Sequence, residues 1–517
     1  MNRLVFAFCL LGLMGMQAGM SAAEAQRPNI IVVFADDLGF SDLGCYGGEI
    51  QTPNLDRLAT EGLRFSQFYN CALCGPSRAA LMTGLHPHQV GITNWTGLLT
   101  NNCVTLFEML KRGGYATCAV GRLDMVTAEN WHEPENIARH VDRFFGSTGH
   151  TGPGNYFANT RNTAFYRDGE PYVIPEGGYK TDLITDFTVE FLQQRDKEKP
   201  FLLYMAHYAP HWPLHAKEED IAKYRTLYRE LGWDAAREKR LSRLIEKGLL
   251  PAGTRLSPRD PRAAAWKDTK HRDWEAERMA VYAAQIDSLD QSVGRIMDTL
   301  RATGADQNTL VFFLSDNGAS DQAVGQLDKP DRTWRADGVR TRVGNQPDIM
   351  PGPGDTFVTA GPAWSNVANA PFRHHKQSNH EGGIASPLIA WWPGVITRQG
   401  GISDELSHIT DITATIFDVA GVCYPESFKN RDVTPIAGRS LLRVLRGESH
   451  QGHDSLCWAT SGSKAIRMGD WKLVSFKGQP WELYDLATDR TELNDLAEQQ
   501  PERVASMAAA FESCHAT

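Results

Sequence analysis

Short apolar runs alternate with helical patterns along most of the chain, and this alternation restricts the possible fold more than any other feature. The runs lack the polar alternation of half-exposed strands, so we expect burial on both faces, as in a mostly parallel sheet. They lie at residues 29–35, 116–120, 201–205, 309–314 and 387–392, and helical patterns occur at 54–65, 105–112 and 273–303. The sequence predicts an α/β sandwich with a large, mostly parallel central sheet flanked by helices.

Two stretches interrupt this pattern, and the pattern changes near residue 450. Residues 216–272 are rich in charged side chains and are expected to form a solvated, charged helical insertion. Residues 319–370 contain many Gly, Pro and Asp, which predicts an irregular excursion of the kind that shapes the rim of an active site. Short alternating strands and a helix predict a small α+β C-terminal subdomain over 448–517. Residues 26–447 are then the main domain.

The N-terminal 25 residues have the pattern of a secretory signal peptide. Arg3 supplies a positive charge, residues 4–13 are apolar, and small residues at 21–25 offer cleavage sites. A membrane anchor is the alternative, but three glycines and a glutamine interrupt the apolar stretch. We expect a secreted or periplasmic protein with no stable membrane association. The net charge of −9 also argues against a general nucleic-acid binder.

Acidic pairs follow two of the predicted strands. Asp36 and Asp37 come after the first apolar run, and Asp316 and Asn317 come after the fourth. The carboxyl ends of parallel strands meet at one edge of a sheet, where ligands bind. Close carboxylates repel one another unless a cation joins them, and oxygen ligands favour Ca²⁺ or Mg²⁺. Turn and cap chemistry explains either pair alone, but two matching pairs favour a metal site.

Residues 71–84, CALCGPSRAALMTG, contain two cysteines three positions apart before a helical run. Cys74 would lie near the start of a helix, where the dipole favours developing negative charge, and Arg78 is close to that end. A redox or zinc pair with Cys71 is the alternative, as is a buried structural thiol. No second pair stands at zinc-finger spacing, and a thioredoxin-like context is absent. Eight cysteines remain after removal of the signal, and their pairing stays open.

Two further stretches carry candidate functional side chains. His211 follows the 201–205 run within HYAPHWP, and Lys376 lies within HHKQSNHEGG at 374–383. A lone surface histidine or lysine usually has no special role. If both follow strands at the same edge as the acidic pairs, they provide an acid and an anion clamp.

Taken together, these motifs resemble the sulfatase family of the alkaline-phosphatase-like superfamily. CGPSR at 74–78 matches the family signature C-x-P-S-R, and the likeness spans about residues 28 to 500. The other matching motifs are PNI with Asp36-Asp37, TPNLDRLA at 52–59, PHWP at 210–213, DNG at 316–318, Lys376 with EGG at 381–383, and WELYDL at 481–486. The resemblance implies an alkaline-phosphatase-like sandwich whose residues 26–447 form the catalytic domain.

The resemblance also implies roles for individual residues. Cys74 would be oxidised by a formylglycine-generating enzyme, and its aldehyde hydrate would attack sulfate sulfur and later eliminate sulfate. Arg78 would steady this nucleophile, while His211 and Lys376 would hold the sulfate oxygens and assist the departing oxygen. The expected ligands of one Ca²⁺, with Mg²⁺ less favoured, are Asp36, Asp37, Asp316, Asn317 and the modified Cys74.

The chain departs from the family pattern after the second strand. The family usually has Gly-Lys-x-His there, but this chain has Gly121-Arg122-Leu123-Asp124. Arg122 can grip an oxyanion with a rigid fork. Asp124 adds negative charge near an anionic substrate, and we hypothesise that it pairs with Arg122 or acts as the base in place of the histidine.

We therefore expect a secreted calcium sulfatase that hydrolyses a sulfate monoester of a carbohydrate or an aryl alcohol. A phosphonate monoester or phosphodiester hydrolase is an alternative, since it shares the same apparatus. A sulfated-glycan-binding pseudoenzyme is a second alternative, motivated by Asp124. The sequence leaves open the sugar, the sulfate position and the oligomeric state.

Overall fold

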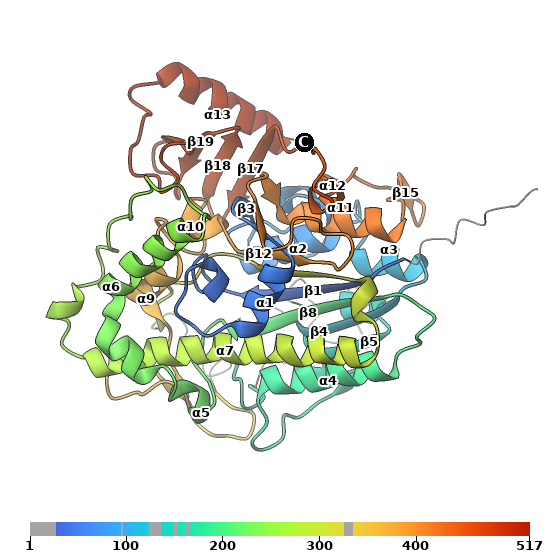
Figure 1. The fold of residues 1–517 in the computed structure, drawn as a ribbon, viewed down its shortest axis with the longest axis horizontal. Helices are drawn as coiled ribbons and strands as arrows, with labels where there is room; N and C mark the ends of the chain where they lie inside the picture. The colour runs from blue at the N-terminus through green and yellow to red at the C-terminus, as the bar shows by residue number, and fades with distance from the viewer. Residues whose placement is uncertain are drawn as a thin grey trace, which may run out of the picture.

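A ten-stranded sheet forms the centre of the molecule (Figure 1). The computed structural model describes residues 27–94, 97–123, 136–148, 154–161, 165–324 and 334–516. The strand order is β13-β2-β12-β9-β1-β8-β4-β5-β6-β7. These strands are β1 (Asn29–Asp36), β2 (Leu63–Phe65), β4 (Ala116–Arg122), β5 (Arg143–Ser147), β6 (Phe165–Arg167), β7 (Glu170–Pro171), β8 (Phe201–Pro210), β9 (Thr309–Ser315), β12 (Leu388–Trp391) and β13 (Gly401–Ser403).

The centre of this sheet is parallel. β1 pairs in parallel with β8 and β9, and β4 pairs in parallel with β8 and β5. β12 runs antiparallel to β9 and β2, and the β5-β6-β7 edge is also antiparallel. The predicted α/β sandwich with a mostly parallel sheet is confirmed.

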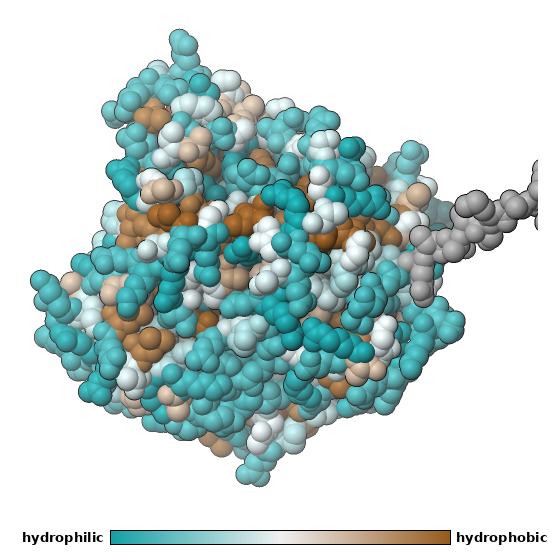
Figure 2. All heavy atoms as spheres, viewed as in Figure 1, coloured by the Kyte–Doolittle hydropathy of each residue, from teal (hydrophilic) through white to brown (hydrophobic). Residues whose placement is uncertain are grey.

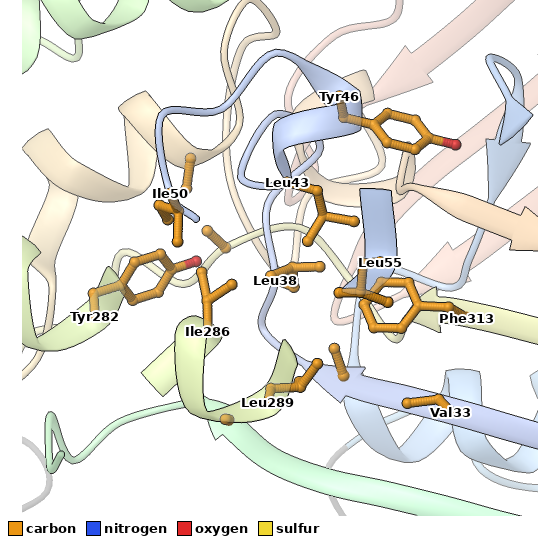
Figure 3. Packing of buried hydrophobic residues seen from close by; sticks show 14 of the residues in the cluster. Val33, Leu38, Leu43, Tyr46, Ile50, Leu55, Tyr282, Ile286, Leu289 and Phe313 are labelled. Carbon is orange, nitrogen blue, oxygen red and sulfur yellow. The ribbon is translucent and has the colours of Figure 1, made fainter. Parts of the chain in front are cut away.

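Both faces of the sheet are buried because helices cover each of them. Val33 of β1 packs with Leu55 and Leu289 in one core cluster, while Val32 and its neighbours on the other face belong to a second cluster (Figure 3). The first face is covered by α1 (Pro53–Glu61), α4 (Lys180–Gln194) and α7 (Arg272–Ala302), and the second by α2 (Cys74–Thr83), α3 (Leu106–Arg112) and α11 (Ile409–Ala420). The continuous apolar strands therefore have a simple cause, since neither side meets water.

The helix expected over 54–65 is shorter than predicted. α1 ends at Glu61, and Leu63–Phe65 forms β2 against Ala390 and its neighbours in β12. A side chain at Gly62 would meet the Ala390 carbonyl oxygen at 2.2 Å, so the backbones approach closely at this turn. The apolar–basic–apolar sequence of these three residues is compatible with a helix or a strand. They form a strand because the edge of β12 is available for pairing.

The charged segment 216–272 contains α5 (Glu218–Ile221) and α6 (Arg225–Glu246), which breaks at Gly232 with φ 62°. The segment is less solvated than its composition suggests. Arg240 is fully buried, and its guanidinium pairs with Asp42 and Glu49, each at 2.7 Å. The insertion is therefore fastened to the loop after β1.

The excursion at 319–370 has regular structure in its described part. It contains the short parallel pair β10 (Arg342–Val343) and β11 (Thr356–Phe357), and the helix α9 (Gly361–Ala368). The remaining small elements of the main domain are β3 (Phe68–Tyr69) with β14 (Ser407–His408), β15 (Ser427–Phe428) with β16 (Arg431–Asp432), α10 (Glu381–Ile384) and α12 (Leu442–Leu445).

A smaller unit stands at the C-terminus, at the top of Figure 1. Four antiparallel strands, β17 (Ser455–Thr460), β18 (Ser463–Met468), β19 (Trp471–Ser475) and β20 (Glu482–Asp485), pack against α13 (Pro501–Ala516). A disulfide joins Cys457 of β17 to Cys514 of α13, a pairing that the sequence had left open. On the visible face, hydrophobic side chains gather where this unit meets the main body (Figure 2). No helix in the described ranges has the length and apolarity needed to cross a bilayer.

Candidate active site

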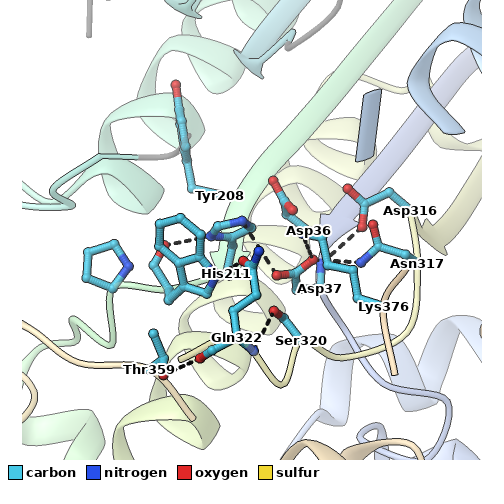
Figure 4. A network of polar contacts seen from close by, with 12 residues as sticks. Asp36, Asp37, Tyr208, His211, Asp316, Asn317, Ser320, Gln322, Thr359 and Lys376 are labelled. Atoms are coloured by element: carbon cyan, nitrogen blue, oxygen red, sulfur yellow. Dashed lines mark hydrogen bonds and ion pairs between the residues drawn. The ribbon is translucent and has the colours of Figure 1, made fainter. Parts of the chain in front are cut away.

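The acidic side chains that follow β1 and β9 lie together at one edge of the sheet (Figure 4). The two strands are parallel neighbours with Ala35 opposite Ser315, so their carboxyl ends are level. Asp37 has a positive φ of 65°, a conformation that aspartate tolerates, and its amide donates to Asp316 Oδ1 at 3.0 Å. The Ser315 hydroxyl accepts from Leu38 N at 3.1 Å and donates to the Asn317 carbonyl at 3.0 Å. These bonds fix the two strand ends against each other.

Cys74 is brought to the same edge by α2, whose first residue it is. The Ser77 hydroxyl accepts from Cys71 N at 2.9 Å and donates to the Asp316 carbonyl at 2.5 Å. Ser77 therefore ties the start of the helix to the end of β9. Ligand atoms of Asp36, Cys74 and Asp316 all lie within 4.8 Å of one another.

Two arginines lie beneath this group. Arg78 is fully buried, and its Nη2 lies 3.1 Å from both Asp36 Oδ2 and Asp316 Oδ2. Its Nη1 donates to the Arg122 carbonyl at 2.7 Å, and Arg122 itself forms a short ion pair with Asp36. The guanidinium of Arg78 also stacks over the Phe34 ring at 4.9 Å. Arginine is suited to such burial because it stays charged and presents a planar fork.

Lys376 and His211 face Asp37 from other segments. Lys376 Nζ lies 2.5 Å from Asp37 Oδ1, which also accepts from Asn317 Nδ2 at 2.6 Å. His211 Nε2 lies 3.5 Å from Asp37 Oδ2, and its Nδ1 lies 2.6 Å from the Trp212 carbonyl. A carbonyl only accepts, so the His211 proton sits on Nδ1.

Three buried oxygens in this group have no hydrogen-bond partner among the described residues. They are Asp36 Oδ1, Asp37 Oδ2 and Asn317 Oδ1. Leaving such acceptors unpaired costs roughly 1–3 kcal/mol each, and more when the group is charged. Carboxylate and amide oxygens are the ligands that hard divalent cations prefer. The donor set therefore fits a divalent cation.

The charges perturb one another strongly. Burial raises the pKa of Asp36, but Arg122, His211 and Arg78 together hold it well below its usual range. Burial and the adjacent Asp36 raise the pKa of Asp316 well above its usual range. Two carboxylates this close cannot both ionise without added positive charge. Burial also lowers the pKa of His211 to about 4, although Asp37 opposes this shift.

The structure thus gathers nearly all of the residues singled out from the sequence. They are Asp36, Asp37, Cys74, Arg78, Arg122, His211, Asp316, Asn317 and Lys376. Asp124 lies outside the described residues. Cys71 points elsewhere, with its Sγ 3.7 Å from His408 Nε2.

The sequence had not singled out two residues that shape this site. Ser77 was quoted only as part of a motif; it is the fourth residue of α2, and its contact with the Asp316 carbonyl joins segments far apart in sequence. Gln322 accepts from Trp212 Nε1 at 2.9 Å, while its carbonyl accepts from the Thr359 hydroxyl at 2.8 Å (Figure 4). Nothing in the sequence around Gln322 pointed to this contact.

Comparison with known proteins identifies the family. Residues 28–422 match the family model described as Sulfatase, and residues 373–512 match N-sulphoglucosamine sulphohydrolase, C-terminal. An uncharacterized sulfatase from Schizosaccharomyces pombe is 32% identical over 93% of this chain and 92% of its own. An arylsulfatase from Klebsiella aerogenes is 31% identical over 82% of this chain and 94% of its own.

Solved structures share the fold. The crystal structure of Ps i-CgsB in complex with k-i-k-neocarrahexaose has a TM-score of 0.66 and 24% identity, covering 95% of this chain and 93% of that one. Together with the family match, this likeness confirms the expected alkaline-phosphatase-like sandwich.

Proposed function

This chain belongs to the sulfatase family and is a sulfuric ester hydrolase, and we propose that it removes sulfate from a sulfated carbohydrate by means of formylglycine at position 74 and a bound Ca²⁺. The observation that carries the proposal is the group of buried oxygens without a hydrogen-bond partner in the described structure on Asp36, Asp37 and Asn317, which lies beside Cys74 at the start of α2. Aryl sulfates are a second substrate class, since one relative is named an arylsulfatase.

Cys74 is the proposed site of oxidation, which a formylglycine-generating enzyme would carry out during maturation. The formylglycine hydrate would supply the attacking hydroxyl and a second hydroxyl that allows sulfate to leave. The helix N-terminus at Cys74 favours negative charge on an oxygen at this position.

Asp36, Asp37, Asp316 and Asn317 would hold the cation. The irregular set of oxygens favours Ca²⁺, because Mg²⁺ demands a near-ideal octahedron and retains water. The cation would supply positive charge to the attacking oxygen and to a sulfuryl oxygen. Arg78 and Arg122 hold Asp36 by ion pairs and so keep its free oxygen directed at the pocket.

Lys376 and His211 would bind sulfuryl oxygens and assist the leaving oxygen. With the Nδ1 proton directed at the Trp212 carbonyl, Nε2 of His211 carries a proton only as the imidazolium. Burial lowers the pKa of His211 to about 4, and the facing Asp37 carboxylate opposes this shift and so favours the charged form. Nε2–H can then pass its proton to the departing alkoxide.

Asp124 remains the proposed substitute for the family histidine. We propose that it pairs with Arg122 or takes the proton when sulfate is released. Asp124→Asn should then slow sulfate release severely, which a burst of alcohol followed by slow turnover would reveal. Unchanged turnover would remove Asp124 from the mechanism.

Export is also part of the proposal, with residues 1–25 removed as a signal peptide. We retain the boundary between a catalytic domain at 26–447 and a C-terminal subdomain at 448–517, because α12 ends at Leu445 and β17 begins at Ser455. N-terminal sequencing of the exported protein would test the cleavage.

The central experiment combines mass spectrometry with activity assays. The peptide that contains residue 74 is checked for conversion of cysteine to formylglycine, and the same sample is assayed on sulfate and phosphate esters of one alcohol. We expect conversion and a strong preference for sulfate, and Cys74→Ser should lose turnover. A preference for phosphate esters, or full activity of the unmodified chain, would contradict the proposal.

A further inference from the structure

A groove beside the candidate active site takes no part in the chemistry proposed above. Its volume is about 630 Å³, within the range of small-molecule pockets. Three distant segments line it: residues 258–262 of the charged insertion, 373–378 around Lys376, and 476–477 at the β19–β20 turn. Asp321 also borders it, next in sequence to Ser320 and Gln322, which lie in the active-site network (Figure 4). Lys376 therefore lies between the groove and the candidate active site, with its buried side chain directed at Asp37.

The groove is rich in cations, although the chain carries a net charge of −9. It is lined by Arg259, Arg262, Arg373 and Lys477 against the carboxylates of Asp260 and Asp321, whereas the buried Lys376 ammonium faces Asp37. Arg262 Nη2 lies 2.7 Å from both of those carboxylates, and its side chain is still 52% exposed. The two aspartates thus hold the guanidinium in place while leaving part of it open to a ligand.

Lys477 differs from these arginines because it forms no ion pair with any residue in the described part of the chain. It is exposed, and its Nζ lies 5.1 Å from the centre of the Phe476 ring. Phe476 in turn packs on the His374 ring, with centroids 5.2 Å apart. An aromatic edge with a neighbouring ammonium group suits a sugar ring that carries an anionic substituent.

We propose that this groove binds a second anionic group, a sulfate or a carboxylate, of the saccharide whose first sulfate lies at Lys376. The proposal rests on the proposed function, and it narrows the substrate class to saccharides with at least two anionic groups. Arg262 and Lys477 contact the second anion, and Phe476 packs against the sugar that bears it. Each comes from a segment that contributes nothing to the cation pocket.

The test uses pairs of disaccharides that differ only in a second sulfate, built on glucosamine, galactosamine and galactose. The ratio of kcat/KM for the disulfated over the monosulfated member is measured on wild-type protein whose residue 74 has been checked. We expect the wild-type enzyme to prefer the disulfated member by about tenfold, since charge-assisted hydrogen bonds contribute roughly 1.5–3 kcal/mol. Lys477→Ala should lower this ratio about fivefold to tenfold, and added salt should lower it in wild type.

Lys464→Ala is the matched control, because Lys464 is an exposed lysine of the same small sheet outside the groove. It should leave the ratio at the wild-type value. The proposal would be overturned by a wild-type ratio near one or by an unchanged ratio in Lys477→Ala. It would also be overturned if the wild-type enzyme turned over an aryl sulfate but none of the disaccharides.

A different result would contradict the proposed function itself, namely no turnover of any sulfate ester, including aryl sulfates. Calorimetric binding of the same disaccharide pairs then tests the groove. Tighter binding of the disulfated member that Lys477→Ala abolishes would support it, and equal binding by both proteins would overturn it.

Discussion

Two buried clusters of charged side chains, one at the strand ends and one beneath the C-terminal unit, use similar residues in different ways. In the second cluster, Lys472 Nζ lies 2.9 Å from Glu381 Oε1 and 2.8 Å from Glu492 Oε1. Glu381 Oε2 accepts from Tyr69 and Arg490 at 2.8 and 2.7 Å, and Glu492 Oε2 accepts from Glu381 N at 2.9 Å. Every carboxylate oxygen of this C-terminal cluster faces a cation or a donor.

The strand-end cluster is less complete. Among the described residues, Asp36 Oδ1 and Asn317 Oδ1 have no hydrogen-bond partner, and Asp37 Oδ2 has only the more distant His211 Nε2 at 3.5 Å, whereas Glu492 Oε1 lies 2.8 Å from the Lys472 ammonium. Burial alone therefore does not distinguish a functional charge cluster from a structural one. The difference is whether the protein itself brings a cation close to each buried carboxylate oxygen, as Lys472 does for Glu492 Oε1, or leaves buried oxygens without a hydrogen bond from the described part of the chain, as at Asp36 and Asn317.

The largest expected effect is a loss of enzymatic activity when the strand-end cluster is altered. Asp316→Asn should lower kcat/KM for sulfate esters by at least about 10³-fold, because it removes a proposed ligand charge beside the nucleophile. The metal-free variant should unfold at nearly the wild-type urea concentration, since the substitution also relieves repulsion from Asp36. The exposed Asp298→Asn serves as control. Wild-type metal content and activity in Asp316→Asn would contradict the assignment.

The next largest expected effect is a loss of folding stability when the C-terminal cluster is altered. Lys472→Met should cost about 3–5 kcal/mol of unfolding free energy, because it leaves Glu381 and Glu492 buried without their shared cation. Urea unfolding followed by fluorescence measures this, with the exposed Lys464→Met as control. Adding Glu492→Gln should recover part of the loss. A loss below about 1 kcal/mol would mean that the cluster relaxes into contact with water.

Removal of the metal should lower the folding stability through the strand-end cluster only. Calcium at about 100 times its dissociation constant should add about 2.7 kcal/mol to the stability of the chelator-treated protein. This increment should persist in Lys472→Met and disappear in Asp316→Asn. Thermal unfolding with and without calcium measures it, and an equal increment in both variants would place the cation elsewhere.

The smallest effect concerns a buried group kept neutral rather than paired. His207 is fully buried in β8, neither ring nitrogen has a partner in the described structure, and burial lowers its pKa to about 3. Between pH 6.5 and 3 this histidine binds a proton in the unfolded chain but not in the folded chain. The stability that is present above pH 6.5 is therefore lost as the pH falls toward 3.

His207→Leu should therefore flatten the acid limb of the stability curve by up to about 1.4 kcal/mol per pH unit. Urea unfolding between pH 4 and 7 measures the slope, and the exposed His271→Gln should leave it unchanged. An unaltered slope in His207→Leu would show that this histidine is protonated alike in both states.

Local sequence was sufficient for five strands of the sheet, β1, β4, β8, β9 and β12, and for the acidic ends of β1 and β9, but not for β2, β5, β6, β7 and β13. Apolar runs of strand length need no partner to be recognised, and Asp36-Asp37 and Asp316-Asn317 follow them directly. The end of α1 could not be found in this way, because Leu63–Phe65 fits a helix or a strand, and pairing with β12 decides. The disulfide between Cys457 and Cys514 also needed three dimensions, since pairing depends on distance and not on spacing.

The amino-acid sequence by itself determined the α/β class, the acidic strand ends and, through its resemblance to the sulfatase signature, the choice of Cys74 over Cys71. Only the tertiary structure decided that Ser77 binds the end of β9, that three buried oxygens near Cys74 have no hydrogen bond within the described ranges, and that Arg262 and Lys477 line one groove beside Lys376. Periodicity and motifs are carried by residues close in sequence, whereas a charge cluster or a groove exists only where distant segments meet.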